Sequence, residues 1–157
     1  MTNSRRAAGV LVAATAALAL AACGSSSDTL SKSDLAAKAN AICKTYNDKG
    51  RAIAKPTAND PAQIAAYWTA AAKLVEEQQA KLRALKPADD VKADWNAYLA
   101  LNDQGIADVP AVIAAANAKD AAAYSAASAK LKALSAKINP AADALGATTC
   151  GSKSSQS

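Results

Sequence analysis

The segment 61–86 constrains the fold of this chain more than any other stretch. A row of mostly apolar residues, which we call its seam, recurs there at alternating steps of four and three. An α-helix brings residues at that spacing onto one face, whereas a half-buried strand needs strict alternation. Asp60 is a good N-cap, and Pro61 stands at the first helical position, where its missing N–H costs nothing. Pro87 is expected to end the helix. The seam residues are Ile64, Trp68, Ala71, Val75, Gln78, Leu82 and Leu85.

Three other segments carry seams of the same kind, so we predict four helices. The first should begin at a cap formed by Ser31 or Ser33, and it should end among the cations Lys49, Arg51 and Lys55, which suit the negative end of a helix dipole. In chain order the three seams are Leu35, Ala39, Ile42, Tyr46 and Ile53; then Val91, Trp95, Tyr98, Asn102, Ile106, Val109 and Ile113; then Tyr124, Ala127, Leu131, Leu134 and Ile138.

Two of these helices contain proline. The third should run from 89 to about 117, with a bend where Gly105 and Pro110 weaken it. In the fourth, Pro140 is expected to bend or break the helix, and Gly146 is typical of a C-cap.

The composition favours helices over sheets. Ala is by far the commonest residue, Phe and His are absent, and β-branched residues are sparse. Ala has the highest helix propensity of all residues. Four helices with short connections predict an all-α fold, an antiparallel up-down-up-down four-helix bundle.

The N-terminal 22 residues have the pattern of a secretory signal peptide, with Arg5 and Arg6 followed by an uncharged run over 7–22. That run is shorter than the ~20 residues that a transmembrane helix needs. At its end, Leu20-Ala21-Ala22-Cys23 resembles the bacterial lipobox. The resemblance implies cleavage after Ala22 and an acylated Cys23, with palmitate-like chains that anchor the protein to the membrane. The alternatives are an exported protein with an incidental Cys23, a buried apolar helix, and a twin-arginine signal that only Arg5 and Arg6 favour.

With Cys23 assigned to the lipid, Cys43 and Cys150 remain in an exported, oxidising setting, and we interpret them as one structural disulfide. A redox-active pair would need the close C-x-x-C spacing, and a zinc site would need more ligands than two thiols in a chain without His. Because Cys43 lies well inside the first helix, we predict that 147–150 folds back over that helix to reach it.

The expected organisation follows from these assignments: residues 1–22 form the signal peptide, 23–32 the lipidated cysteine and a flexible tether, 33–150 the bundle, and 151–157 a disordered polar tail. Loss of Arg5 and Arg6 leaves 18 − 2 = 16 basic against 13 acidic residues, a mild net charge of +3. No dense Lys/Arg block is present, so we expect no nucleic-acid partner.

Three short motifs resemble those of small helical lipoproteins of high-GC, actinobacterial type. They are Ala-Ile-Cys at 41–43, Trp-Asn-Ala-Tyr-Leu at 95–99 and Cys-Gly at 150–151. The resemblance implies the helical fold and a lipid-anchored location on the extracytoplasmic face of the bacterial cell membrane. It implies no activity.

Catalytic chemistry has little support in the sequence. A hydrolase needs a nucleophile with a base, and His is missing. No Gly-rich phosphate loop follows a strand. The carboxylate pairs are interpreted as helix-end charge and solvated faces, and they are Asp90/Asp94, Asp103/Asp108 and Glu76/Glu77. We therefore expect a protein that is not an enzyme, with no cofactor and no metal site.

Five seam residues are candidates for ligand binding: Gln78, Asn102, Trp68, Trp95 and Tyr98. The alternative is that the two amides fix helix register and that Tyr46/Trp68 and Trp95/Tyr98 form separate core layers.

Two alternative functions are consistent with these observations. The first is a membrane-anchored, non-catalytic interaction or structural module with an unknown protein partner. The second is a small-ligand-binding bundle with a pocket near the bend at Gly105–Pro110.

Overall fold

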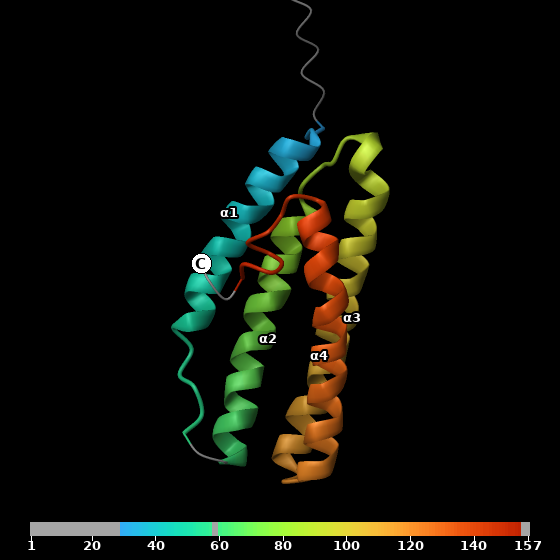
Figure 1. Ribbon diagram of the computed structural model, residues 1–157. Coiled ribbons are helices and arrows are strands. Elements are labelled where there is room, and N and C mark those ends of the chain that lie inside the picture. The colour runs from blue at the N-terminus through green and yellow to red at the C-terminus, as the bar shows by residue number, and fades with distance from the viewer. Residues whose placement is uncertain (1–28, 58–59, 155–157) are drawn as a thin grey trace, which may run out of the picture.

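The computed structural model describes residues 29–57 and 60–154, so the predicted signal peptide over 1–22 and the predicted lipid site Cys23 lie outside the described residues. The four helices are α1 (Lys32–Arg51), α2 (Pro61–Arg83), α3 (Asp89–Asn117) and α4 (Ala121–Ala144). Successive helices run in opposite directions, which confirms the all-α bundle (Figure 1). Within the described ranges no strand forms, and the one extended pairing is a bridge between Leu30 and Pro87.

Three helices begin where a side-chain cap satisfies free backbone N–H groups. Ser31, rather than Ser33, caps α1 and accepts from the backbone N–H of Asp34 at 3.2 Å. Asp60 accepts from the backbone N–H of Ala62 at 2.9 Å, with Pro61 at the first helical position of α2 as predicted. Asp120 caps α4 in the same way.

The end of α2 differs from the prediction. The helix stops at Arg83, and Pro87 lies beyond it in extended backbone. The physical reason is a pairing across the chain: the N–H of Leu30 donates to Lys86 O at 2.7 Å, and the N–H of Ala88 donates to Leu30 O at 2.8 Å. These bonds hold 86–88 extended, and they also fix Leu30, which we had expected in a flexible tether over 23–32.

Helix α1 is shorter than the helix beside it. It ends at Arg51, and the linker residues 52–57 then run alongside α2 without forming a helix (Figure 1). Over this part of the molecule, α2 is therefore accompanied by linker rather than by helix. This leaves one side of α2 only partly covered.

Pro140 was expected to bend or break α4, and of these two alternatives the break is wrong, because the helix continues through Pro140 to Ala144. Pro140 removes the hydrogen bond to the carbonyl of Ala136, but both residues are exposed, so water can satisfy that carbonyl. Helix α3 likewise continues through Pro110, which is also exposed. The chain then leaves α4 at Gly146, whose φ of 80° lies in the left-handed region that favours glycine.

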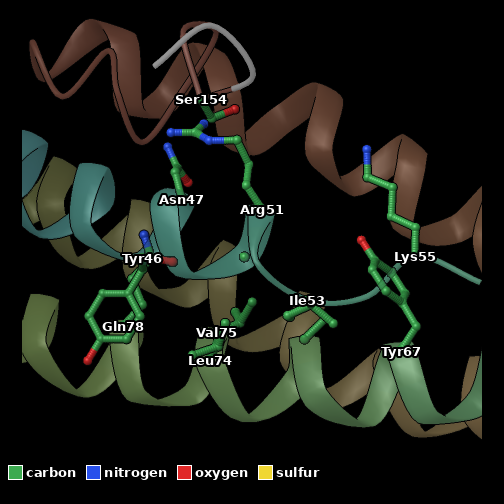
Figure 2. A pocket seen from close by; sticks show the side chains of 12 residues that line it. Tyr46, Asn47, Arg51, Ile53, Lys55, Tyr67, Leu74, Val75, Gln78 and Ser154 are labelled. Carbon is green, nitrogen blue, oxygen red and sulfur yellow. The ribbon is translucent and has the colours of Figure 1, made fainter.

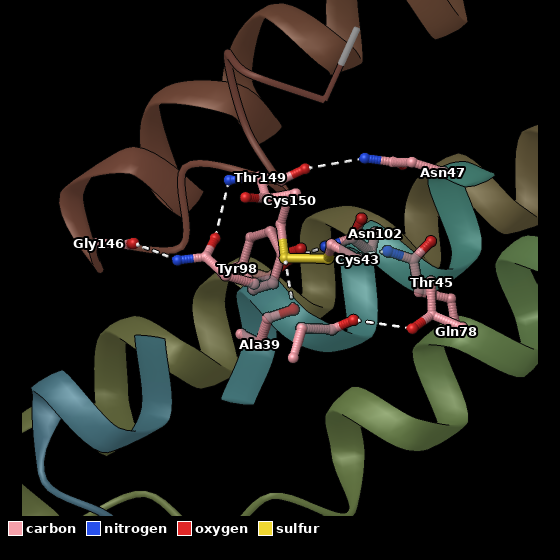
Figure 3. Close-up of a disulfide and its surroundings, with 12 residues drawn as sticks. Ala39, Cys43, Thr45, Asn47, Gln78, Tyr98, Asn102, Gly146, Thr149 and Cys150 are labelled. Atoms are coloured by element: carbon pink, nitrogen blue, oxygen red, sulfur yellow. Dashed lines mark hydrogen bonds between the residues drawn. A yellow bond between two sulfur atoms is a disulfide. The ribbon is translucent and has the colours of Figure 1, made fainter. Parts of the chain in front are cut away.

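The segment 145–151, here called the return segment, folds back over α1 as predicted. Two asparagines of α1 hold it (Figure 3). Asn40 Nδ2 donates to Gly146 O at 3.0 Å, and Asn40 Oδ1 accepts from the N–H of Thr149 at 2.8 Å. Asn47 Nδ2 donates to Thr149 O at 3.1 Å. Both asparagines therefore satisfy backbone groups of a segment that has no helix of its own.

Cys43 and Cys150 form a disulfide, with 5.2 Å between their Cα atoms, and this confirms the pairing. The next residue, Gly151, touches α4 so closely that a Cβ there would lie 2.7 Å from Asn139 O and would overlap the Asp143 carboxylate. The return segment is thus wedged between α1 and α4. Residues 151–154, which we had expected in a disordered tail, form turns, and the N–H of Ser152 donates to Asp143.

The main core lies where α1, α2, α3 and the return segment meet. Its buried residues are Leu35, Ala39, Cys43, Leu82, Val91, Trp95, Tyr98, Leu99, Ala142, Leu145 and Ala147. Seam residues of α1, α2 and α3 therefore meet in one place, together with Ala142 of α4 and residues of the return segment. From the predicted α4 seam, Ile138 packs against this cluster and is partly buried. Among the described residues, no helix is both long and apolar enough to cross a membrane.

Removing the disulfide should destabilise the domain strongly. The bond closes a loop with a sequence separation of 107, and in the chain-entropy model a loop of this size contributes about 4–5 kcal/mol to the free energy of unfolding. Urea denaturation of the oxidised wild type, the reduced wild type and the Cys43→Ala/Cys150→Ala variant measures this loss. Reductant should leave the double variant unchanged. An oxidised wild type with the same midpoint as the reduced protein contradicts the expectation.

Candidate functional site

Trp95 and Tyr98 belong to the core, not to an open site. Each is 1% exposed, and their ring centroids lie 5.3 Å apart. Desolvation raises the pKa of the Tyr98 hydroxyl, and a hydrogen bond with Asn102 offsets part of this rise. The Asn102 amide also donates to Tyr98 O one turn back in α3, at 3.0 Å. Trp95, Tyr98 and Asn102 therefore contribute to the packing of α3 in the core.

The other two sequence candidates lie elsewhere, so the structure does not bring the five together. Trp68 Nε1 donates to the hydroxyl of Tyr124 on α4 at 3.3 Å, rather than forming a layer with Tyr46. Gln78 Nε2 donates to Cys43 Sγ at 2.9 Å, so this seam amide contacts the disulfide. Tyr46 and Gln78 both line a groove that Trp68 does not reach.

A buried polar link between α2 and α3 was missed in the sequence. Gln79 is 5% exposed, and its Nε2 donates to Leu99 O and to Asp103 Oδ1, both at 2.9 Å. Asp103 also pairs with Arg83. The one available signal is that α2 carries two adjacent glutamines, and helix geometry points neighbouring residues toward different partners. Gln78 faces α1, and Gln79 faces α3.

The most developed candidate site is a groove of about 400 Å³ between the end of α1 and the middle of α2, which we call the α1–α2 groove. Figure 2 shows side chains from α1, the linker and α2 gathered around it, with Ser154 at its edge. It is lined by Tyr46, Asn47, Gly50, Arg51, Ile53, Lys55, Tyr67, Ala71, Leu74, Val75, Gln78 and Ser154. The groove exists because α1 ends before it has covered α2.

The groove has an apolar floor and a cationic edge. Val75 is the one large apolar side chain classed as exposed in the described part of the chain, with 40% of its surface accessible. Among the residues that the structure describes, Arg51 and Lys55 are the charged residues of the lining, and none of the lining residues is a carboxylate. Lys49 lies over the Tyr46 ring, 4.6 Å from its centroid. The same cations were interpreted from sequence as helix-end charge.

One carboxylate lies next to this edge without lining the groove. Asp48 pairs with Arg51 and with Lys44 Nζ, the latter at 3.0 Å. The hydrogen bond from Lys44 is the largest influence on the Asp48 pKa, and with Arg51 it outweighs desolvation and lowers that pKa. Arg51 is thus partly neutralised, whereas Lys55 makes no ion pair with any residue that the structure describes.

A groove of about 330 Å³ adjoins the α1–α2 groove and shares Ile53, Lys55 and Tyr67 with it. Two further grooves lie elsewhere on the bundle. One of about 310 Å³ lies between α2 and α3 beside Pro110, and Lys73 and Glu76 give it one charge of each sign. The other, of about 380 Å³, lies at the end of the bundle between Ile64 and Tyr124. The predicted bend site thus has a surface groove. Gly105 itself faces α4, where a Cβ would lie 3.5 Å from Leu134.

Of the three carboxylate pairs that are close in sequence, Asp103 and Asp108 form ion pairs with different helices. Asp103 pairs with Arg83 of α2, and Asp108 pairs with Lys130 of α4 at 2.7 Å. Within the described ranges, no group of three or more Cys, Asp or Glu residues could hold a metal ion. No family model, curated protein or solved structure matches this chain.

Replacing Asp103 with Ala should lower the free energy of unfolding by about 1–2 kcal/mol. Buried Gln79 loses one of two acceptors, and the half-exposed pair with Arg83 adds only about 0.2–1 kcal/mol. Desolvation raises the Asp103 pKa, but the hydrogen bonds from Arg83 and Gln79 lower it more, so the net pKa is below the ordinary value. The stabilisation is therefore fully present above about pH 4 and is lost as the pH falls through the lowered pKa.

Urea denaturation at neutral and acidic pH measures both effects. Asp94→Ala is the matched control, since Asp94 is an exposed carboxylate of α3 that makes no ion pair in the described part of the chain. Equal losses for the two variants, or a loss at Asp103 that does not shrink in acid, contradict the assigned role.

Proposed function

We propose that the protein is a lipoprotein held by an acylated Cys23 on the extracytoplasmic face of the bacterial cell membrane, where its helical domain serves as a non-catalytic interaction or structural module. The observation that carries the proposal is the Cys43–Cys150 disulfide. Structural disulfides are typical of oxidising compartments outside the cytoplasm. The bond uses two of three cysteines and leaves the third in the lipobox-like segment.

The arrangement of ionisable groups supports a non-catalytic role. Asp48 and Asp103 have lowered pKa values, and each is held by cations or amides. Tyr98 has a raised pKa but is buried in the core. In the described part of the chain, Asp48, Asp103 and Tyr98 are not partners of one another, so they do not form a nucleophile paired with a general base. Acid–base and covalent catalysis depend on such a pair.

The position of Leu30 supports a specific orientation on the membrane. Leu30 is bonded to the α2–α3 connection, at the end of the bundle where α1 begins (Figure 1). Leu30 is the seventh residue after Cys23, and an extended chain of that length spans at most about 25 Å. An acylated Cys23 would therefore keep this end near the bilayer and direct the α3–α4 turn away from it.

Replacing Cys23 with Ser should release the protein from the membrane. The variant should leave the detergent phase and the membrane fraction when expressed in a bacterial host, because it lacks the thiol that receives the lipid. The control is Ser26→Ala, a substitution three residues after Cys23 in the same predicted tether, and this variant should remain anchored. The intact mass of the purified wild type should show acyl chains on Cys23. A Cys23→Ser protein that is as membrane-bound as the wild type refutes the anchor.

A second candidate function is small-ligand binding beside Pro110, which the groove of about 310 Å³ favours. Native mass spectrometry of protein extracted gently from its own membranes tests it. A bound small molecule should be lost from Ile113→Trp, which fills this groove, and kept by Val75→Trp, which fills the α1–α2 groove. Loss from Val75→Trp alone places the ligand elsewhere and excludes this candidate.

A further inference from the structure

We propose that the α1–α2 groove binds a single-chain amphipathic anion, a molecule with one extended apolar chain and one terminal anionic group. The inference concerns a site that is separate from the anchor, and it does not rest on acylation of Cys23. Its basis is the combination of shape, apolar floor and one-signed charge in a single groove.

The shape of the groove suits an extended chain. Tyr67 and Gln78 mark its two ends on α2, and the helix rises by about 16 Å over the 11 steps from one to the other. Its volume of about 400 Å³ falls within the range of small-molecule sites. A protein partner would need an interface larger than ~1,000 Å², which a groove of these dimensions does not supply.

The floor supplies the apolar contact. Ala71, Leu74 and Val75 lie along α2 between the two ends of the groove. Ile53 of the linker faces α2 from the other side of the groove (Figure 2). Val75 is 40% exposed, whereas Leu82 of the same seam is buried and the other seam residues of α2 are half-buried. An apolar chain placed along this floor would cover the surface that α1 leaves open.

The edge supplies the charge. Lys55 lies near the Tyr67 end of the groove and, among the residues described, has no carboxylate to pair with. An anionic head could therefore contact Lys55 without displacing an existing ion pair. Arg51 donates to Asp48 and has further N–H groups on its guanidinium. Two cations and no carboxylate stand among the described residues of the lining. These residues therefore disfavour a cationic ligand, and they attract an anionic ligand more strongly than a neutral one.

The test uses the full-length chain carrying Cys23→Ser, so that no acyl group on that residue competes, and decanoate as the probe below its micelle concentration. Calorimetry gives the affinity, and methyl NMR reports the location. Decanoate should shift the methyl signals of Ile53, Leu74 and Val75. Lys55→Glu should weaken binding by about tenfold or more, because a charge contact is replaced by repulsion. Decyl maltoside, with a similar chain and a neutral head, should also bind at least about tenfold more weakly.

The matched control is Lys132→Glu, an exposed lysine of α4 outside every groove described above, which should keep the affinity within about twofold. Val75→Ser, at an exposed position that the fold tolerates, should weaken decanoate and decyl maltoside alike. Equal effects of Lys55→Glu and Lys132→Glu overturn the proposal. Methyl shifts at Ile106 and Ile113 in place of the three groove residues overturn it as well, whether or not Cys23 carries a lipid.

Discussion

The bond between Cys43 and Cys150 is the constraint on which the arrangement of the bundle depends. In a regular four-helix bundle the first and fourth helices pack directly on each other. Here α1 packs mainly on α2, and the return segment stands between it and α4. The disulfide, with the two bonds of Asn40 to that segment, makes the connection that helix packing leaves incomplete.

The helices were predictable from sequence because each start has a local chemical signal. Asp60 with Pro61 satisfied the first free N–H groups of α2 without help from distant residues. The errors arose where the outcome depends on the three-dimensional surroundings of a residue, namely its exposure to water or its contacts with distant residues. Pro140 does not break α4, since the carbonyl that it frees is exposed to water. Helix α2 ends early because Leu30, far away in sequence, pairs with the residues that follow it.

The candidate site was less predictable than the fold. A hydrophobic seam identifies which residues are covered but not how far the neighbouring helix extends over them. Val75 continues the seam of α2 and yet is exposed, because α1 ends at Arg51. The cations Arg51 and Lys55 fit the helix-end pattern equally well whether or not they border a groove. Only the path of the linker after Arg51 places these two cations in the lining of the α1–α2 groove.

The position of the disulfide also governs how the domain transmits mechanical tension. A pull between Leu30 and Cys150 would pass through residues 30–43 and then across the sulfur–sulfur bond. Helices α2 and α3 lie wholly inside the bridged loop and would carry none of this load. The chain could lengthen to at most about 50 Å, the extended length of residues 30–43, before the covalent path became taut. The bond would therefore limit the extension of the domain and protect the helices inside the bridged loop from unfolding under tension.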